Sequence, residues 1–399
     1  MTLNNVKEIF DTYKLHSKEI EIPLEQIKRE LKPYENKIVL YGAGSAGIAF
    51  LHYLKDAEII PRYFADGDKE KHGKICEGLE IIAPETIIER IGSDALVIVT
   101  INTDGQNYCK DFKKELLAGG HQGVHKHLRE CGCVNVIDYV YFRRCYQLFR
   151  GEKYNLPACS DVYFMLENQD MIEKAFSVME SERAKATFLK LLEFRMLTDR
   201  VDIPTSPEKG MYFEYDFFQR KDDEVFIDCG ACGGSSLSEF LEINHHCFKA
   251  YYGIEPDPTN FDKLEKFISC LSESDRGKMK IYNAAAYAHN KGTNFFILNG
   301  PGSFQAENGT DKVKTIKIDD ILNKEAATYI KMNIEGSEVS ALRGAEYTIR
   351  NYYPRMAIMG YHKTSDLWKV PLLIKEYYGD YHLELRSYMR NVAFTYYAY

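Results

Sequence analysis

The stretch VFIDCGACGGSS at residues 225–236 decides the fold of the carboxyl-terminal half of the chain. An apolar run ends at Asp228, and glycines follow two and six positions later, at Gly230 and Gly234. Glycines at such spacing let the backbone turn sharply and approach a ligand closely. The helix predicted from Ser235 would begin with its amide groups facing the same place. The stretch therefore predicts a strand, a glycine-rich turn and a helix, arranged around a bound ligand.

The same stretch contains Cys229-x-x-Cys232, which is also the spacing of a redox pair or of half a zinc site. The ten cysteines of the chain are scattered, and no second pair stands at matching spacing. Cys131 and Cys133 begin an apolar run and are expected in a strand. We therefore interpret Cys229 and Cys232 as small residues of the turn, and we predict no metal site.

The composition excludes several classes of protein. A chain of 399 residues predicts two or three domains, and 45% hydrophobic with 28% charged residues is ordinary for a soluble protein. The net charge of −8 gives no basic surface for nucleic acid. The longest apolar runs are too short for a membrane span, and the first residues are too charged for a signal peptide. We expect a cytoplasmic protein with reduced thiols.

Strands and helices alternate on both sides of a helical stretch. From 224 onward, strands are predicted near 224–230, 250–257, 280–287, 328–336 and 355–362, with a closing antiparallel hairpin after 381. Glu255 ends the second of these strands, where a carboxylate can accept both hydroxyls of a ribose. Upstream, four shorter strands are predicted near 37–42, 61–66, 94–100 and 133–138. The alternation predicts two parallel, doubly wound α/β sheets.

Six segments carry a resemblance that covers residues 223–399. They are VFIDCGACGGSS, YYGIEPDPTNFDKL, IYNAAAYAHNKGTNFFI, VKTIKIDDIL, YIKMNIEGSEVSALRGAEYTI and MGYHKTSDLWKVPLLI. In this order they resemble the FkbM family of S-adenosylmethionine-dependent methyltransferases. The resemblance implies a seven-stranded class I methyltransferase sheet. It also implies O-methyl transfer to a hydroxyl, commonly on a sugar or another secreted metabolite.

The resemblance also implies roles for individual residues. Asp228, Gly230 and Gly234 would hold the methionine part of the cofactor, and Glu255 its ribose. Asn283, at the end of the third strand, would lie near the adenine.

Asn333 would stand beside the cofactor too, but the family usually has Asp at this position. Because Asn can hydrogen-bond but cannot take a proton or neutralise a metal, we expect methyl transfer without a bound metal.

Two residues are candidates for the chemistry of methyl transfer. The acceptor hydroxyl must lose its proton, and a general base helps. His362 follows an apolar strand, at the edge where ligands bind in open α/β sheets, and an ordinary histidine pKa suits a base. Glu335 is expected to position the substrate. Glu335 and Glu338 also precede a helix, where a carboxylate is favourable for capping alone, and His362 could equally be structural.

A second glycine-rich turn, VLYGAGSAG at 39–47, places Gly42, Gly44 and Gly47 between a predicted strand and helix, with Asp66 at the end of the next strand. This is the context of a dinucleotide-binding motif. The continuation resembles the small Rossmann-like domain at the front of bacterial sugar acyltransferases and a related domain of sugar methyltransferases. The resemblance implies a nucleotide or nucleotide-sugar site. The alternative is a domain whose glycines serve packing alone.

The predicted organisation is a helical segment at 1–36, a Rossmann-like nucleotide-binding-type domain at 37–140, a helical connector at 141–222 and a methyltransferase domain at 223–399. The leading hypothesis is S-adenosylmethionine-dependent O-methyl transfer to a sugar, a glycan, a nucleotide sugar or a related metabolite. The alternatives are an NAD-dependent oxidoreductase built on the first glycine turn, and an inactive nucleotide-sugar-binding protein. A homodimer is compatible with the sequence.

Overall fold

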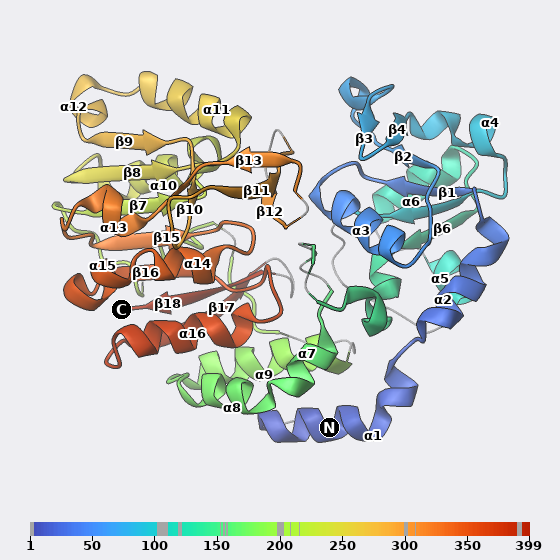
Figure 1. Cartoon of the computed structure of the whole chain (residues 1–399), viewed down its shortest axis with the longest axis horizontal. Coiled ribbons are helices and arrows are strands. Elements are labelled where there is room, and N and C mark those ends of the chain that lie inside the picture. The colour runs from blue at the N-terminus through green and yellow to red at the C-terminus, as the bar shows by residue number, and fades with distance from the viewer. Residues whose placement is uncertain are drawn as a thin grey trace. The chain divides into compact units, whose positions relative to one another are not determined.

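The computed structural model of the chain describes residues 4–101, 111–118, 122–151, 153–154, 156, 159–197, 203–207, 209–214, 216–298, 302–307, 309–388 and 393–399. The chain divides into two compact units. The first consists of Met1–Gln169 and Leu189–Asp202, and the second of Asp170–Phe188 and Ile203–Tyr399. The segment 141–222, expected as a connector, contributes to both units. Figure 1 shows one large sheet in each unit.

The first unit is built on a six-stranded sheet with the order β3-β4-β2-β1-β5-β6. All neighbouring pairs are parallel except β3 and β4. The four predicted strands are present, whereas the short β3–β4 hairpin lies in a charged, glycine-containing stretch that gave no strand signal. The strands are β1 Ile38–Tyr41, β2 Tyr63–Ala65, β3 Ile75–Cys76, β4 Leu79–Ile82, β5 Leu96–Val99 and β6 Asn135–Asp138.

Helices flank this sheet and explain its continuous apolar strands. The sequences IVLY of β1 and LVIV of β5 are buried at every position, as expected for a parallel sheet covered on both faces. The predicted helix at 104–118 is described only from 111, and its first part lies outside the described residues. The helices are α1 Val6–Ile20, α2 Leu24–Leu31, η1 Lys32–Tyr34, α3 Ser45–Asp56, η2 Lys69–Lys71, η3 Pro84–Thr86, α4 Ile87–Ile91, α5 Phe112–Ala118, α6 Gln122–Glu130, η4 Tyr139–Arg144, η5 Tyr146–Phe149 and α7 Val162–Glu167.

The second unit contains the predicted seven-stranded sheet, with the order β17-β18-β16-β15-β7-β8-β9. All neighbouring pairs are parallel except those of β18, which runs antiparallel to both β16 and β17 and forms the predicted closing hairpin with β17. From the β7–β15 pair, β8 and β9 follow outward on one side and β16 on the other, which makes this pair the topological switch point. The strands are β7 Val225–Cys229, β8 Ala250–Ile254, β9 Met279–Tyr282, β15 Tyr329–Met332, β16 Arg355–Met359, β17 Leu383–Tyr388 and β18 Ala393–Ala398.

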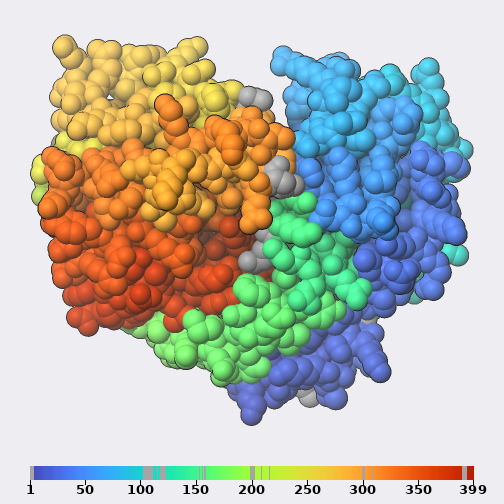
Figure 2. Space-filling view, viewed as in Figure 1, coloured from blue at the N-terminus to red at the C-terminus, as the bar shows by residue number. Residues whose placement is uncertain are grey.

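Two small sheets and a set of helices complete the second unit. In Figure 2 yellow, orange and red atoms, from the later part of the chain, cover the face of this unit turned to the viewer. The small sheets pair β10 Ala285–Ala286 with β14 Thr315–Ile316, and β11 Thr293–Phe296 with β12 Phe304–Gln305 and β13 Asp311–Val313. The helices are η6 Cys232–Gly234, α10 Ser235–Asn244, α11 Pro258–Ser269, α12 Glu273–Arg276, α13 Ile318–Leu322, α14 Glu338–Arg343, α15 Glu346–Tyr352 and α16 Asp366–Tyr377.

The chain enters the second unit at the start of helix α8 (Gln169–Ser177) and returns to the first unit within helix α9 (Glu182–Leu197). Among the described residues, no helix combines the length and the apolar character needed to cross a membrane.

Candidate functional site

A cavity of about 180 Å³ lies at the carboxyl ends of β7, β8 and β15, beside the switch point of the second sheet. Open α/β sheets bind their ligands at this edge. Polar and charged groups converge on it from several loops. Its lining includes Tyr212, Gly230, Glu255, Lys331, Asn333, Glu335 and Ser337.

Glu255 is held in one orientation by the backbone around it. Oε2 accepts the N–H of Cys232 at 2.9 Å, and Oε1 accepts the N–H of Asp257 at 2.9 Å. Burial raises the pKa of Glu255 above its usual range, although these two amides oppose the effect. A carboxylate has about four acceptor positions, so each oxygen keeps capacity for one more donor. The side chain is therefore a fixed double acceptor on the cavity wall.

Asp228 lies behind the wall, in a buried ion pair. Lys331 Nζ is 3.0 Å from its Oδ1, while Ser236 Oγ and the Tyr251 hydroxyl donate to its Oδ2 at 2.5 and 3.1 Å. Burial opposes the charge on Lys331, but Asp228 outweighs it and raises the lysine pKa. Lys331 also donates to the carbonyl of Gly230 at 2.7 Å. Asp228 thus acts on the cavity through Lys331 and the turn.

The backbone conformation and the packing of the chain require glycine at both predicted positions. Gly230 has a φ of +81°, and a Cβ there would lie 2.0 Å from the carbonyl oxygen of Asn333. Gly234 has a φ of +97°, and its Cβ would lie 2.9 Å from Phe267 Cδ1. Left-handed backbone and these close approaches both exclude a side chain. Of the two, only Gly230 lines the cavity.

A buried charged cluster stands beside Glu335. His362 is buried, with Nδ1 2.9 Å from Glu338 Oε1 and Nε2 3.6 Å from Glu335 Oε2. Burial lowers the histidine pKa, but the two carboxylates, Glu338 first, outweigh it and raise the pKa to about 9. Burial, with Glu338 nearby, raises the pKa of Asp366 to about 7. At neutral pH His362 is an imidazolium with a carboxylate facing each ring nitrogen.

Among the described residues that line the cavity, two carry a buried polar atom without a hydrogen-bond partner. Asn333 Nδ2 donates to the Tyr212 hydroxyl at 2.8 Å, but Oδ1 is unpaired. Ser337 is 4% exposed and its Oγ is also unpaired. Buried polar groups normally find partners, and an exception calls for an explanation such as an absent ligand. These two atoms fit a cavity that receives a polar molecule.

Comparison with known proteins identifies this unit. Residues 228–396 match the family model of the methyltransferase FkbM domain. Residues 228–396, the larger part of the second unit, form a methyltransferase FkbM domain. No curated protein matches the chain significantly.

One of the similar solved structures supports the fold of both units. The methyltransferase FkbM of Methylobacillus flagellatus KT has 20% identity and a TM-score of 0.65, covering 99% of this chain and 100% of its own. At this identity the likeness concerns the fold alone. Human METTL16 in complex with SAH has 10% identity and a TM-score of 0.30, covering 60% and 93% of the two chains. UDP-D-quinovosamine 4-dehydrogenase from Vibrio fischeri has 23% identity and a TM-score of 0.18, covering 25% and 75%.

The FkbM domain brings only part of the predicted site together. Gly230, Glu255, Asn333 and Glu335 line the cavity. The other predicted residues, Asp228, Gly234, Asn283 and His362, are not part of its lining. Asn283 is exposed and donates to the carbonyl of Glu255 at 3.1 Å, so it ties the end of β9 to the loop after β8.

Lys331, Tyr212 and Ser337 are among the lining residues that were not predicted from the sequence. Lys331 was detectable as a charged residue inside an otherwise apolar strand, which signals a buried partner. Tyr212 comes from a stretch without a regular pattern. Ser337 gave no signal that distinguishes it from an ordinary serine before a helix.

The first unit has a cavity of its own, of about 420 Å³, where its glycine turn meets the end of β2. Gly42, Gly44 and Asp66 line it, together with Lys71, whereas Gly47 does not. A Cβ on Gly47 would lie 2.0 Å from the carbonyl oxygen of Gly42, so this glycine serves packing.

Asp66 is fixed in this cavity by three donors. It accepts the N–H groups of Ala43 and Asp68 at 2.9 Å each, and Lys71 Nζ at 2.9 Å. Burial would raise the pKa of Asp66, but these donors outweigh it and lower the pKa. Asp66 therefore stays ionised at the mouth of the glycine turn.

Proposed function

We propose that the chain is an S-adenosylmethionine-dependent O-methyltransferase that methylates a hydroxyl of a sugar, a glycan or a related metabolite. The observation that carries the proposal is the polar cavity of the FkbM domain at the switch point, with Glu255 fixed on its wall. The acceptor class rests on the resemblance of the six sequence segments to the FkbM family.

Glu255 would accept the two ribose hydroxyls, one on each oxygen, because its orientation is already set by two backbone amides. The unpaired Asn333 Oδ1 and Ser337 Oγ would take further donors or acceptors of the bound molecules. When bound, S-adenosylmethionine supplies an electrophilic methyl group. The cavity is smaller than the roughly 300–1,000 Å³ of typical ligand sites, so the cofactor would extend past its mouth.

Glu335 is proposed to receive the proton of the acceptor hydroxyl, which reverses the roles assigned from the sequence. It lines the cavity, and 26% of its side chain is exposed. His362 has a pKa raised to about 9 and faces carboxylates through both nitrogens, so at neutral pH it has no free lone pair. A base must accept a proton within hydrogen-bond reach of the substrate. His362 is therefore a positioning residue that holds Glu335 by charge.

Titration calorimetry with S-adenosylmethionine, S-adenosylhomocysteine, NAD and UDP-sugars tests the proposal on the full chain. We expect both S-adenosyl compounds to bind with one site per chain, and Glu255→Ala to weaken both. Comparing glycans by mass spectrometry from cells with and without the gene would then identify the methylated hydroxyl. Failure of both S-adenosyl compounds to bind would overturn the proposal.

A second candidate function concerns the first unit, which we propose binds a nucleotide or nucleotide sugar. Gly44 has ordinary extended backbone, and a Cβ there would meet no atom within 4 Å. Neither the backbone nor packing requires this glycine, and it lines the 420 Å³ cavity beside Asp66 and Lys71. A phosphate close to the backbone gives a reason for the missing side chain.

The variant Gly44→Val tests this second proposal. It should abolish binding of a UDP-sugar while leaving S-adenosylmethionine affinity and thermal stability unchanged. Unchanged UDP-sugar binding in the variant would contradict the nucleotide site. Binding of NAD, with reduction of the nicotinamide, would instead favour the oxidoreductase alternative.

A further inference from the structure

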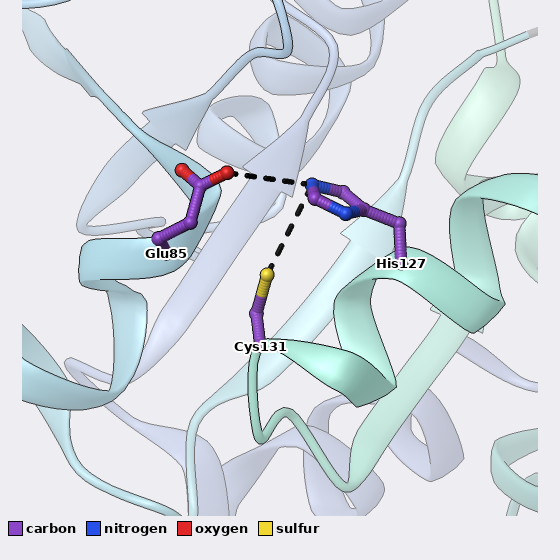
Figure 3. Close-up of side chains that lie close together, drawn as sticks. All are labelled: Glu85, His127 and Cys131. Carbon is purple, nitrogen blue, oxygen red and sulfur yellow. Dashed lines mark hydrogen bonds and ion pairs between the residues drawn. The ribbon is translucent and has the colours of Figure 1, made fainter.

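Three different metal-binding side chains converge in the first unit, in a part of the chain that the proposed functions do not use. Glu85 comes from η3, which follows β4, while His127 lies on α6 and Cys131 in the turn after it. Figure 3 shows the three side chains pointing toward one another. His127 Nε2 lies 3.7 Å from Glu85 Oε1 and 3.9 Å from Cys131 Sγ, and the three donor atoms lie within 4.8 Å of one another.

The separations and the donor types fit one tetrahedral zinc ion. Zinc–ligand bonds of about 2.0–2.3 Å place tetrahedral ligand atoms about 3.3–3.8 Å apart. The observed 3.7 and 3.9 Å lie close to this range, and the third pair, Glu85 and Cys131, lies within 4.8 Å. Rotation of the exposed Glu85 side chain would bring its carboxylate to the ion. Thiolate, imidazole and carboxylate together suit Zn²⁺, whereas Mg²⁺ and Ca²⁺ prefer oxygen ligands alone. Three protein ligands leave the fourth position to water.

The backbone holds the three residues in place independently of any metal. Cys131 N donates to His127 O at 3.0 Å, so the two ligands stand one helical turn apart. Gly132 follows with a φ of +90°, and a Cβ there would lie 3.3 Å from Ile88 Cγ1. The turn is therefore packed closely against α4, which continues directly from η3 and Glu85.

An ordinary surface ion pair does not account for the whole arrangement. The Glu85 and His127 side chains are 65% and 42% exposed, and such a pair contributes little to stability. It gives no reason for a thiol on the same imidazole nitrogen. We propose that Glu85, His127 and Cys131 bind one Zn²⁺ ion, which ties the turn after α6 to η3. The sequence predicted no metal site, because Glu85 stands far from His127 and Cys131 along the chain.

The test uses the full chain, stripped of metal with a chelator and kept reduced. Zn²⁺ is titrated in competition with a chromophoric chelator, and Co²⁺ is used as a spectroscopic probe. We expect one tightly bound Zn²⁺ per chain, a thiolate-to-cobalt charge-transfer band, and no competition by excess Mg²⁺. Zn²⁺ should raise the melting temperature of the full chain, because an ion that binds only the folded state stabilises it.

Cys131→Ser and His127→Ala should each weaken Zn²⁺ binding at least tenfold and remove the melting shift. Cys76→Ser is the matched control, since Cys76 lies on β3 of the same unit outside the cluster, and it should bind as the unaltered chain does. Glu85→Gln provides an exposed third variant if a cysteine variant does not fold. Sub-stoichiometric binding, or binding unchanged in both Cys131→Ser and His127→Ala, would overturn the site.

Discussion

Lys331 and Asp228 face each other in register on the neighbouring strands β15 and β7, with Nζ 3.0 Å from Oδ1 and both side chains buried. Removing one partner of such a pair leaves an uncompensated charge in the interior, which is far more costly than the pair's net contribution to stability. The pair also fixes the turn at Gly230, because Lys331 donates to its carbonyl. It therefore joins the stability of the sheet to the shape of the cavity.

The variant Lys331→Met should lower the free energy of unfolding by about 3–5 kcal/mol, since it strands the Asp228 carboxylate. Adding Asp228→Asn should restore part of this loss by removing the charge. Urea denaturation of both variants measures the effect, with the exposed Lys249→Met as the matched control. If the free energy of unfolding of Lys331→Met lies within about 1 kcal/mol of that of the unaltered chain, the pair is not buried as described.

Replacing Glu255 by Ala should weaken S-adenosylmethionine binding by about 1.5–3 kcal/mol, the cost of losing a hydrogen bond to a charged group. Since about 1.4 kcal/mol is tenfold in affinity, the loss should exceed tenfold. Calorimetry provides the measurement. Glu265→Ala, on the exposed side of α11, should leave the affinity unchanged. Equal affinities in the two variants would remove the ribose assignment.

Stability should fall as the pH rises from about 6.5 through 9. His362 has a folded-state pKa raised to about 9 against its usual 6.5, so its contribution is complete below pH 6.5 and is lost above pH 9. The charges that face it are those of Glu338, Glu335 and Asp366. Asp366, with a raised pKa of about 7, acts in the same direction at lower pH.

The measurement is the free energy of unfolding between pH 7 and 9.5, for the unaltered chain and for His362→Gln. The shift corresponds to about 3 kcal/mol at most. The free energy of unfolding of the variant should depend much less on pH. The buried thiols and phenols titrate alike in both proteins. Parallel curves would mean that His362 is not an imidazolium in the folded protein.

The variant Ser337→Ala should leave stability unchanged or raise it slightly, because it removes a buried hydroxyl that has no partner. The same change should weaken binding of S-adenosylmethionine or of the acceptor, by about 1 kcal/mol for one lost hydrogen bond. Thermal melting and calorimetry on one preparation test both halves. A clear loss of stability with unchanged binding would show that the hydroxyl serves the fold.

The parallel strands could be predicted because the pattern that indicates a strand, a short apolar run bounded by turns, is local in the sequence. The apolar runs that end at Asp228, Glu255 and Asn333 are short and bounded by turns, and all three end at the carboxyl edge of one sheet. A single strand was predicted near 280–287, but β9 ends at Tyr282, directly before Asn283, and β10 joins another sheet. At the break, Asn283 donates to the Glu255 carbonyl, a contact between distant residues that no local pattern contains.

The sequence alone determined the order of the elements, the family of the second half and the edge of the sheet where its polar residues gather. Only the tertiary structure decided which of them face the cavity and which carry charge. Asp228 lies behind the cavity wall because it pairs with Lys331, which stands 103 positions later in the chain but on the neighbouring strand. His362 is charged because Glu338 and Glu335 enclose it. The spacing of apolar residues indicates which side of a helix or strand is buried. The charge of a side chain depends on neighbours that come together only when the sheet has formed.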